Sequence, residues 1–147
     1  MYALGPRAVV TNHLVGPSAR DPKNLQVMAS TSTLARRGRG EQLLQRLAPE
    51  VELQDVVALL RERRGVDDVP LQLGDRRAID ALLAAHGVVM DTTARVLWVS
   101  EAPHLLGRFV AFDLRAHFAP EYQPHTDEPL PNLPADPLLT SGDYERW

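Results

Sequence analysis

Asn12 and His13 stand side by side at the end of a short β-prone run, Ala8 to Thr11, in the sequence AVVTNHL. Local sequence leaves two interpretations of Asn12 open. It can be a turn residue that ends a strand, a common position for asparagine. It can also be catalytic, because a side-chain amide on a rigid strand can donate an N–H to a developing oxyanion, a contact worth about 3 kcal/mol.

Arg36 is a second candidate and lies further along the chain, in STLARRGRGEQLL. It can be one more surface arginine, or a fixed positive charge that lowers the pKa of a nucleophile or holds a carboxylate. The histidines lack the spacing of metal ligands, since no i,i+4 pair, HxH or HExxH pattern occurs. There is no GxSxG elbow, and LGDRR lacks the lysine and glycines of a phosphate loop. We therefore expect no metal and no cofactor.

The composition limits the classes of function. A length of 147 residues, with 44% hydrophobic and 24% charged residues, is typical of one soluble globular domain. The net charge of −3 argues against a general nucleic-acid binder. The absence of cysteine excludes disulfides, thiolate metal sites and a cysteine nucleophile within this sequence. No apolar run could span a bilayer and no secretory signal is recognisable, so we expect a cytoplasmic protein without membrane partners.

The first half of the chain predicts one strand followed by helices. The strand is expected over residues 7–13 and would be closed by the turn-forming stretch GPSARDPKN. Residues 25–31 fit either a short strand or an irregular approach to a helix. Leucine spacing predicts helices over 33–47 and 51–65, the first with Ser and Thr as N-cap candidates. A strand this close to Met1 suggests that the sequence is truncated.

The second half predicts an antiparallel meander. A turn or short helix leads into a strand at 84–91, and RVLWVS and GRFVAFDL supply two more strands. The alternation of Val96, Trp98 and Phe109 suits a sheet that is covered on at least one face. From Ala119 the sequence is rich in proline and acidic residues, which predicts an extended, poorly packed tail docked by Leu138, Leu139, Tyr144 and Trp147. The element order predicts an α+β fold, with one domain over 1–118 and the tail over 119–147.

Several stretches together resemble a known family. VVTNH, STLARRGRGEQLL and GVVMDTTARVLWVSEAPHLLGRFVAFDL occur in an order that is similar to the later part of the C45-type acyltransferases and hydrolases. These are relatives of acyl-coenzyme A:6-aminopenicillanic acid acyltransferase within the N-terminal-nucleophile (Ntn) hydrolases. The resemblance covers roughly residues 7–115, and the tail ADPLLTSGDYERW also resembles the end of longer members.

The resemblance implies an αββα sandwich with antiparallel sheets, which would be incomplete in this chain. An N-terminal cysteine, freed by self-cleavage, would attack an amide or thioester of a small molecule. Asn12 matches the asparagine that helps to stabilise the oxyanion. Thr33 and Arg36 match the family's Ser/Thr-x-x-Arg element, whose hydroxyl and guanidinium face the nucleophile and the substrate. Arg39 and EQLL match the helix that packs behind it.

The missing cysteine is the main departure from the family pattern, so this polypeptide alone is not expected to catalyse the family reaction. One hypothesis is a C-terminal fragment or split-gene product of a cysteine Ntn amidohydrolase or acyltransferase. The alternative is a non-catalytic remnant or binding module of the same fold. Either hypothesis predicts uncovered apolar surface, and hence a partner that is the missing N-terminal half or a second copy of the chain.

Overall fold

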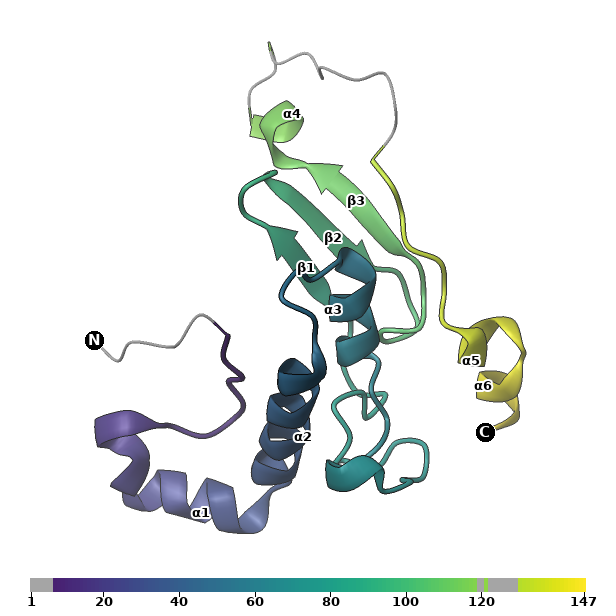
Figure 1. Cartoon of the computed structure of the whole chain (residues 1–147). Helices are drawn as coiled ribbons and strands as arrows, with labels where there is room; N and C mark the ends of the chain where they lie inside the picture. The colour runs from purple at the N-terminus through teal and green to yellow at the C-terminus, as the bar shows by residue number, and fades with distance from the viewer. Residues whose placement is uncertain (1–6, 119–120, 122–129) are drawn as a thin grey trace. The chain divides into compact units, whose positions relative to one another are not determined.

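The computed structural model describes residues 7–118, 121 and 130–147 of the chain. It divides into two compact units, Met1–Ala81 and Leu82–Trp147. The first contains helices and the second is built on a three-stranded antiparallel sheet (Figure 1). This arrangement confirms the α+β fold class. None of the helices in the described ranges combines the length and apolar composition needed to cross a membrane.

The expected strand at 7–13 is wrong, since the described part of that segment forms neither strand nor helix. A strand needs a partner for its backbone groups, and the segment instead runs along helix α2, Thr33–Arg46. Its Arg7 guanidinium donates to the carbonyls of Leu47, Ala48 and Pro49 at 2.6–3.2 Å. Val9 lies so close to Gly40 that a Cβ there would meet it at 3.0 Å. The β-branched side chain is therefore used for packing on a helix.

Residues 25–31, left open between strand and irregular structure, are mostly helical. A 3-10 turn at Gly16–Arg20 leads into α1, Pro22–Ser30. Asp21 caps α1, because its Oδ1 accepts from the amides of Lys23 and Asn24 at 2.9 and 3.3 Å, and Pro22 occupies the first helical position. The Asp-Pro pair that suggested a loop is thus the start signal of a helix.

The two predicted helices are confirmed, although the second is shorter than expected. After α2 comes α3, Leu53–Leu60, which begins with a reciprocal capping box between Glu52 and Asp55 and ends before Arg61. A 3-10 turn follows at Val66–Asp68.

The interior of this first unit is unusually polar. Its buried apolar side chains among the described residues are Val57 and Ala78, whereas the buried polar ones are His13, Asn24, Thr33, Arg39 and Asp80. Arg39 is 1% exposed, and its Nη2 lies 2.7 Å from both Glu62 and Asp68. Each of these polar side chains is held by a specific partner, although Arg39 Nε and Nη1 are buried without one among the described residues, so this unit is held by specific bonds as well as by apolar packing.

The predicted meander is confirmed in the second unit. Strands β1, Val88–Asp91, β2, Val96–Ser100, and β3, Phe109–Asp113, pair in sequence order, with Trp98 opposite Ala111. Val96, Trp98 and Phe109 are all buried on one face, as the alternation predicted.

The opposite face of the sheet is also apolar, but none of its side chains is buried. The strand register brings together on this face Val88, Met90, Leu97, Val99, Val110 and Phe112. Met90 is 64% exposed and Phe112 is 49% exposed. Antiparallel sheets usually alternate apolar and polar faces, so this sheet has the composition of one that is covered on both sides.

The tail expected to be extended is partly helical where it is described. Beyond α4, Leu114–Phe118, the residues 119–120 and 122–129 lie outside the described part of the chain. Leu133 then pairs with Phe109 as an isolated bridge, and Trp98 donates its Nε1–H to the carbonyl of Pro131 at 3.0 Å. Trp147, expected to dock the tail, is 65% exposed.

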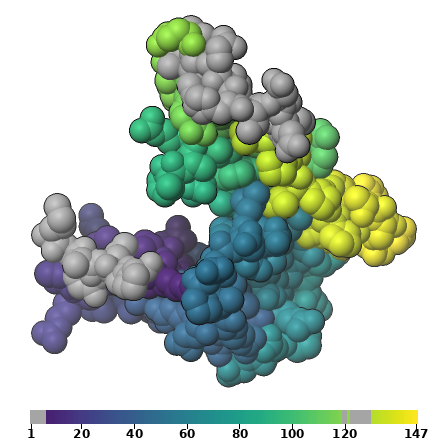
Figure 2. All heavy atoms as spheres, turned by 45° about the horizontal axis from the view of Figure 1, so that its top comes forward, coloured from purple at the N-terminus to yellow at the C-terminus, as the bar shows by residue number. Residues whose placement is uncertain are grey.

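The tail ends in two short helices. Helices α5, Pro137–Thr140, and α6, Asp143–Arg146, pack on each other, and the C-terminal residues form a compact group of atoms, in yellow in Figure 2.

Candidate functional site

The structure brings Asn12 and Arg36 into direct contact. Arg36 Nη2 donates to Asn12 Oδ1 at 2.7 Å, although 24 positions separate the two residues in the sequence. The two candidate residues from the sequence are therefore in contact, one on helix α2 and the other on the segment that runs along it. Because a guanidinium can only donate, the Asn12 oxygen must face Arg36, and the two N–H groups of the amide are directed elsewhere. Asn12 is exposed, so these donors are accessible.

Arg36 is fixed by three neutral oxygens. Besides Asn12, its Nη1 donates to Ser32 Oγ at 2.6 Å and to the carbonyl of Arg76 at 2.9 Å. Ser32 Oγ donates to the same carbonyl at 2.5 Å, so Ser32, an N-cap candidate from the sequence, orients Arg36 instead of capping α2 with its side chain. Within the described residues no carboxylate pairs with Arg36. Its positive charge is thus held in place without being neutralised.

Thr33 is buried and makes no contact with solvent. It is 0% exposed, and its hydroxyl lies 3.0 Å from both His13 Nδ1 and Thr11 Oγ1. Thr11 in turn donates to the carbonyl of Thr33 at 3.2 Å. The resemblance implies a Thr33 hydroxyl that faces the nucleophile, whereas here the hydroxyl is engaged on either side of Asn12. The geometry makes Thr33 a positioning residue for the segment that carries Asn12.

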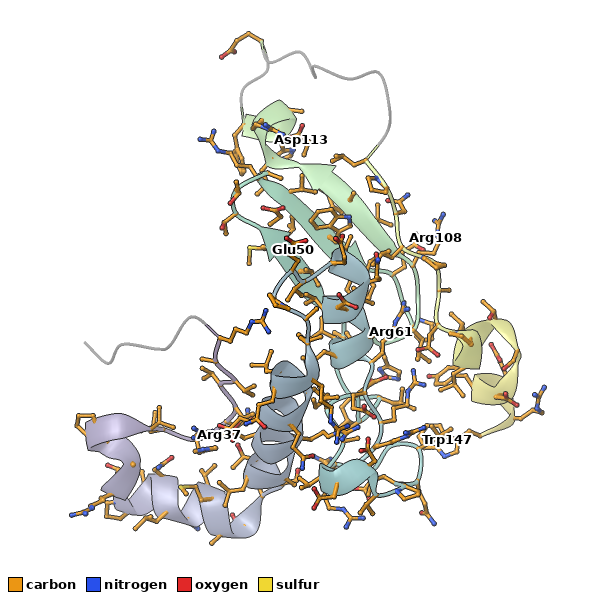
Figure 3. All side chains as sticks on the ribbon, in the orientation of Figure 1. Arg37, Glu50, Arg61, Arg108, Asp113 and Trp147 are labelled. Atoms are coloured by element: carbon orange, nitrogen blue, oxygen red, sulfur yellow. The ribbon has the colours of Figure 1, made fainter. Side chains whose placement is uncertain are left out.

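His13 completes this network in a defined tautomer. Its Nε2 lies 3.2 Å from Nη1 of Arg37, which projects from α2 and is labelled in Figure 3. Since Arg37 can only donate, Nε2 accepts, and the neutral ring carries its proton on Nδ1. That N–H then points at the two threonine hydroxyls. His13 is 6% exposed and is therefore an anchor for the chain and not a solvent-accessible base.

Asn24 anchors the other side of the candidate site. It is 4% exposed, and its Oδ1 accepts from the amide of Leu14 at 2.6 Å. Its Nδ2 donates to the carbonyls of Leu14 and Ala19 at 3.1 and 2.9 Å. The Asn24 side chain thus supplies the hydrogen-bond partners that a neighbouring strand would otherwise give to the backbone of Leu14. Asn24 fixes Leu14, while Thr33 fixes Thr11 and His13, so Asn12 is flanked by anchored residues.

An open pocket of about 830 Å³ adjoins the Asn12–Arg36 pair. Its charged lining residues are Arg36, Arg76 and Arg77, and no acidic residue lines it. Arg77 is paired with Asp75 at 2.6 Å, and the hydrogen bonds from Arg77 lower the pKa of that carboxyl to about 2. The apolar part of the wall consists of Met28, Ala29, Leu34 and Ala35. The site can therefore offer amide N–H donors and positive charge beside an apolar surface.

The described residues contain no group of three or more histidine, cysteine, aspartate or glutamate side chains that could hold a metal. The side chains at the site offer hydrogen bonding and fixed charge. Sequence reasoning missed Arg76, Asn24 and Ser32 as parts of the site. Arg76 gave no detectable signal, because it holds Arg36 through its backbone carbonyl, which is the same in every residue type.

Comparisons with known protein families, with curated proteins and with solved structures give no match to this chain. The structure defines it as an α+β protein with an amide–guanidinium site in its helical unit. A function for this site has to rest on its geometry.

Proposed function

We propose that this chain is the C-terminal portion of a cysteine Ntn amidohydrolase or acyltransferase that acts on amide or thioester bonds. The observation that carries the proposal is the contact of 2.7 Å between Arg36 Nη2 and Asn12 Oδ1. This contact fixes the amide of Asn12 with its N–H groups turned away from Arg36. A donor held in this way is suited to an oxyanion, because it needs no reorganisation when the charge develops.

In this proposal each residue has a separate task. Attack on the carbonyl of an amide or thioester converts the carbonyl oxygen into an oxyanion, and Nδ2 of Asn12 donates to that oxygen. Arg36 orients the amide and, through its positive charge, strengthens the amide as a donor. Thr33 positions the Asn12 segment through Thr11 and His13. The nucleophilic cysteine comes from a polypeptide segment outside this sequence, which itself has no cysteine.

The sheet supports the fold that this proposal requires. A sheet in the middle of an αββα sandwich is covered by another sheet on one face and by helices on the other, so both faces are apolar. The β1–β3 sheet buries Trp98 and Phe109 on one face and exposes Met90 and Phe112 on the other. The uncovered face is where we expect the rest of the sandwich.

A second candidate function is a non-catalytic binding module of the same fold. The observation that favours it is the absence of cysteine from the sequence. In that case the Asn12–Arg36 pair and its pocket would bind a ligand without reaction.

The experiment that separates the two begins with the genomic DNA on the 5′ side of the Met1 codon. The enzyme proposal expects an in-frame or adjacent segment that encodes strands and a cysteine exposed by processing. Co-expressed with this chain, that segment should give release of free thiol from acyl thioesters or of amine from amides. If no such segment exists, or if the assembled protein is inactive on both bond types, the binding module is favoured.

The catalytic role of Asn12 is then tested in the assembled enzyme. Asn12→Ala should lower kcat by about 10² to 10³ with little change in KM, because the bond to the oxyanion forms mainly in the transition state. Asn12→Asp should be at least as damaging, since a negative charge would face a developing negative charge. Gln54→Ala, an exposed amide residue on α3, is the matched control and should retain kcat. A normal kcat for Asn12→Ala would refute the assignment.

A further inference from the structure

The pocket beside Arg36 has unused hydrogen-bond donors. A guanidinium carries five N–H groups. Two on Nη1 and one on Nη2 are engaged by Ser32, Arg76 and Asn12, which leaves two, on Nε and Nη2, without an acceptor in the described part of the chain. Arg36 is only half-buried, so these donors can be reached by a ligand.

The pocket also has an excess of positive charge. Arg36 has no carboxylate partner within the described ranges, and the Arg76 side chain makes no hydrogen bond or ion pair there. Only the charge of Arg77 is neutralised, by Asp75. Two of the three arginines that line the pocket therefore present uncompensated charge. Although the chain has a net charge of −3, this pocket is lined by arginines and by no acidic residue, so an anion would be attracted to it.

The other wall of the pocket is apolar. Met28 and Leu34 line it, and Leu34 is 47% exposed. The hydroxyls of Ser30 and Thr31 on the same wall already donate to the carbonyls of Gln26 and Val27. This wall therefore offers contact area but few free donors, which suits a hydrocarbon portion of a ligand better than a polar one.

We propose that this pocket binds a carboxylate attached to an apolar body, with Arg36 and Arg76 holding the carboxylate and Met28 and Leu34 contacting the body. Carboxylates and phosphates share the chemistry of anionic oxygens, but an inorganic phosphate would leave the apolar wall unused. Because the pocket adjoins Asn12, one part of the inference rests on the proposed function: if the chain belongs to such an enzyme, the substrate is an amide or thioester that carries a carboxylate. The binding itself needs no nucleophile.

The test measures binding to the full chain alone by isothermal titration calorimetry, with hexanoate, hexanamide and inorganic phosphate as probes. Hexanoate should bind at least about tenfold more tightly than hexanamide, because it alone can accept charge-assisted bonds from both arginines. Arg76→Gln and Arg36→Gln should each weaken hexanoate binding by about tenfold or more. Arg77→Gln, at the arginine that is already paired, is the matched control and should change it by less than about threefold.

Three results would overturn the inference: equal affinity for hexanoate and hexanamide, binding of phosphate without binding of hexanoate, or equal effects of Arg76→Gln and Arg77→Gln. Circular dichroism of each variant verifies that it is folded, and Arg76→Gln is the safer one, because it leaves the carbonyl of residue 76 in place. The proposed function fails separately, through the absence of an upstream cysteine segment or of catalytic activity. A chain that binds hexanoate but has no such segment would be the binding module.

Discussion

Asn24 should be one of the most sensitive positions for the stability of the helical unit. Its side chain makes three hydrogen bonds to the backbone, to the amide and carbonyl of Leu14 and to the carbonyl of Ala19, at 2.6–3.1 Å. In Asn24→Ala all three backbone groups lose their partner. Because Asn24 is 4% exposed, water does not replace the side chain without opening the loop.

The magnitude follows from the number of bonds. Each hydrogen bond contributes about 0.5–1.5 kcal/mol net, so three give about 3 kcal/mol. Alanine is a better helix former than asparagine inside α1, which offsets about 0.6 kcal/mol of this loss. We expect Asn24→Ala to lower the free energy of unfolding by about 2 kcal/mol, which is roughly a thirtyfold change in the unfolding equilibrium.

Asn24→Asp should be worse than Asn24→Ala at neutral pH. The carboxylate can still accept from the amide of Leu14, but its second oxygen replaces the Nδ2 donor and faces two carbonyl oxygens. Three acceptors without a hydrogen atom between them repel one another, and the buried charge has no cationic partner in this arrangement.

Urea denaturation followed by far-ultraviolet circular dichroism measures these changes. Both tryptophans lie in the other unit, so the helical signal is the one that reports on α1 and α2. Gln26→Ala, at an exposed position of the same helix, is the matched control and should shift the free energy by less than about 0.5 kcal/mol. If Asn24→Ala behaved like Gln26→Ala, or if Asn24→Asp were the more stable variant, the anchoring role of Asn24 would be refuted.

Two further predictions concern the sheet and acid stability. In Gly107→Ala the new Cβ would lie 2.3 Å from the carbonyl oxygen of Glu101, so we expect the free energy of unfolding to fall by about 2–3 kcal/mol. Urea denaturation followed by tryptophan fluorescence measures this change, and an unchanged midpoint would contradict the prediction. Hydrogen bonds from Arg46 and Arg39 lower the pKa of Asp68 to about 2, from 3.8. Its stabilising contribution should therefore be complete above pH 3.8 and be lost as the pH falls towards 2. Thermal melts of Asp68→Asn should accordingly show a smaller loss of Tm over this range than the wild type does, and equal losses would count against this contribution.

The parts of the fold that sequence could predict are those set by local patterns. Helices α2 and α3 follow from leucine spacing, and the meander follows from alternation and short turns, because both signals lie within the element itself. The strand expected at 7–13 depends on a partner strand that the described chain does not provide. The sequence AVV therefore predicted a strand where the structure has none.

The candidate site was predictable only in part, for a related reason. Residue type and family resemblance single out Asn12 and Arg36, and the structure shows that the two side chains are in contact. The groups that hold them come from up to 40 positions away and act through backbone carbonyls or through ordinary polar side chains. Any residue type at position 76 would offer the same backbone carbonyl, so this contact cannot be recognised from the sequence. Such support becomes visible only in three dimensions.

The surroundings of Asn12 bear on whether it is merely a turn residue. An asparagine that makes a turn usually accepts a hydrogen bond from the amide two residues ahead, which here is that of Leu14. That amide donates to Asn24 instead, at 2.6 Å, and the Asn12 oxygen accepts from Arg36. Asn12 also does not use the left-handed conformation that asparagine tolerates, since it is not among the described non-glycine residues with positive φ.

Neither of the usual reasons for asparagine in a turn therefore applies at position 12. The neighbouring positions are anchored by buried partners: Thr11 and His13 by Thr33, and Leu14 by Asn24. The one side chain in this stretch that is both polar and exposed is the amide whose orientation Arg36 fixes. A segment that is immobilised on both sides of an accessible donor is organised to present that donor, which is the physical requirement for stabilising an anion.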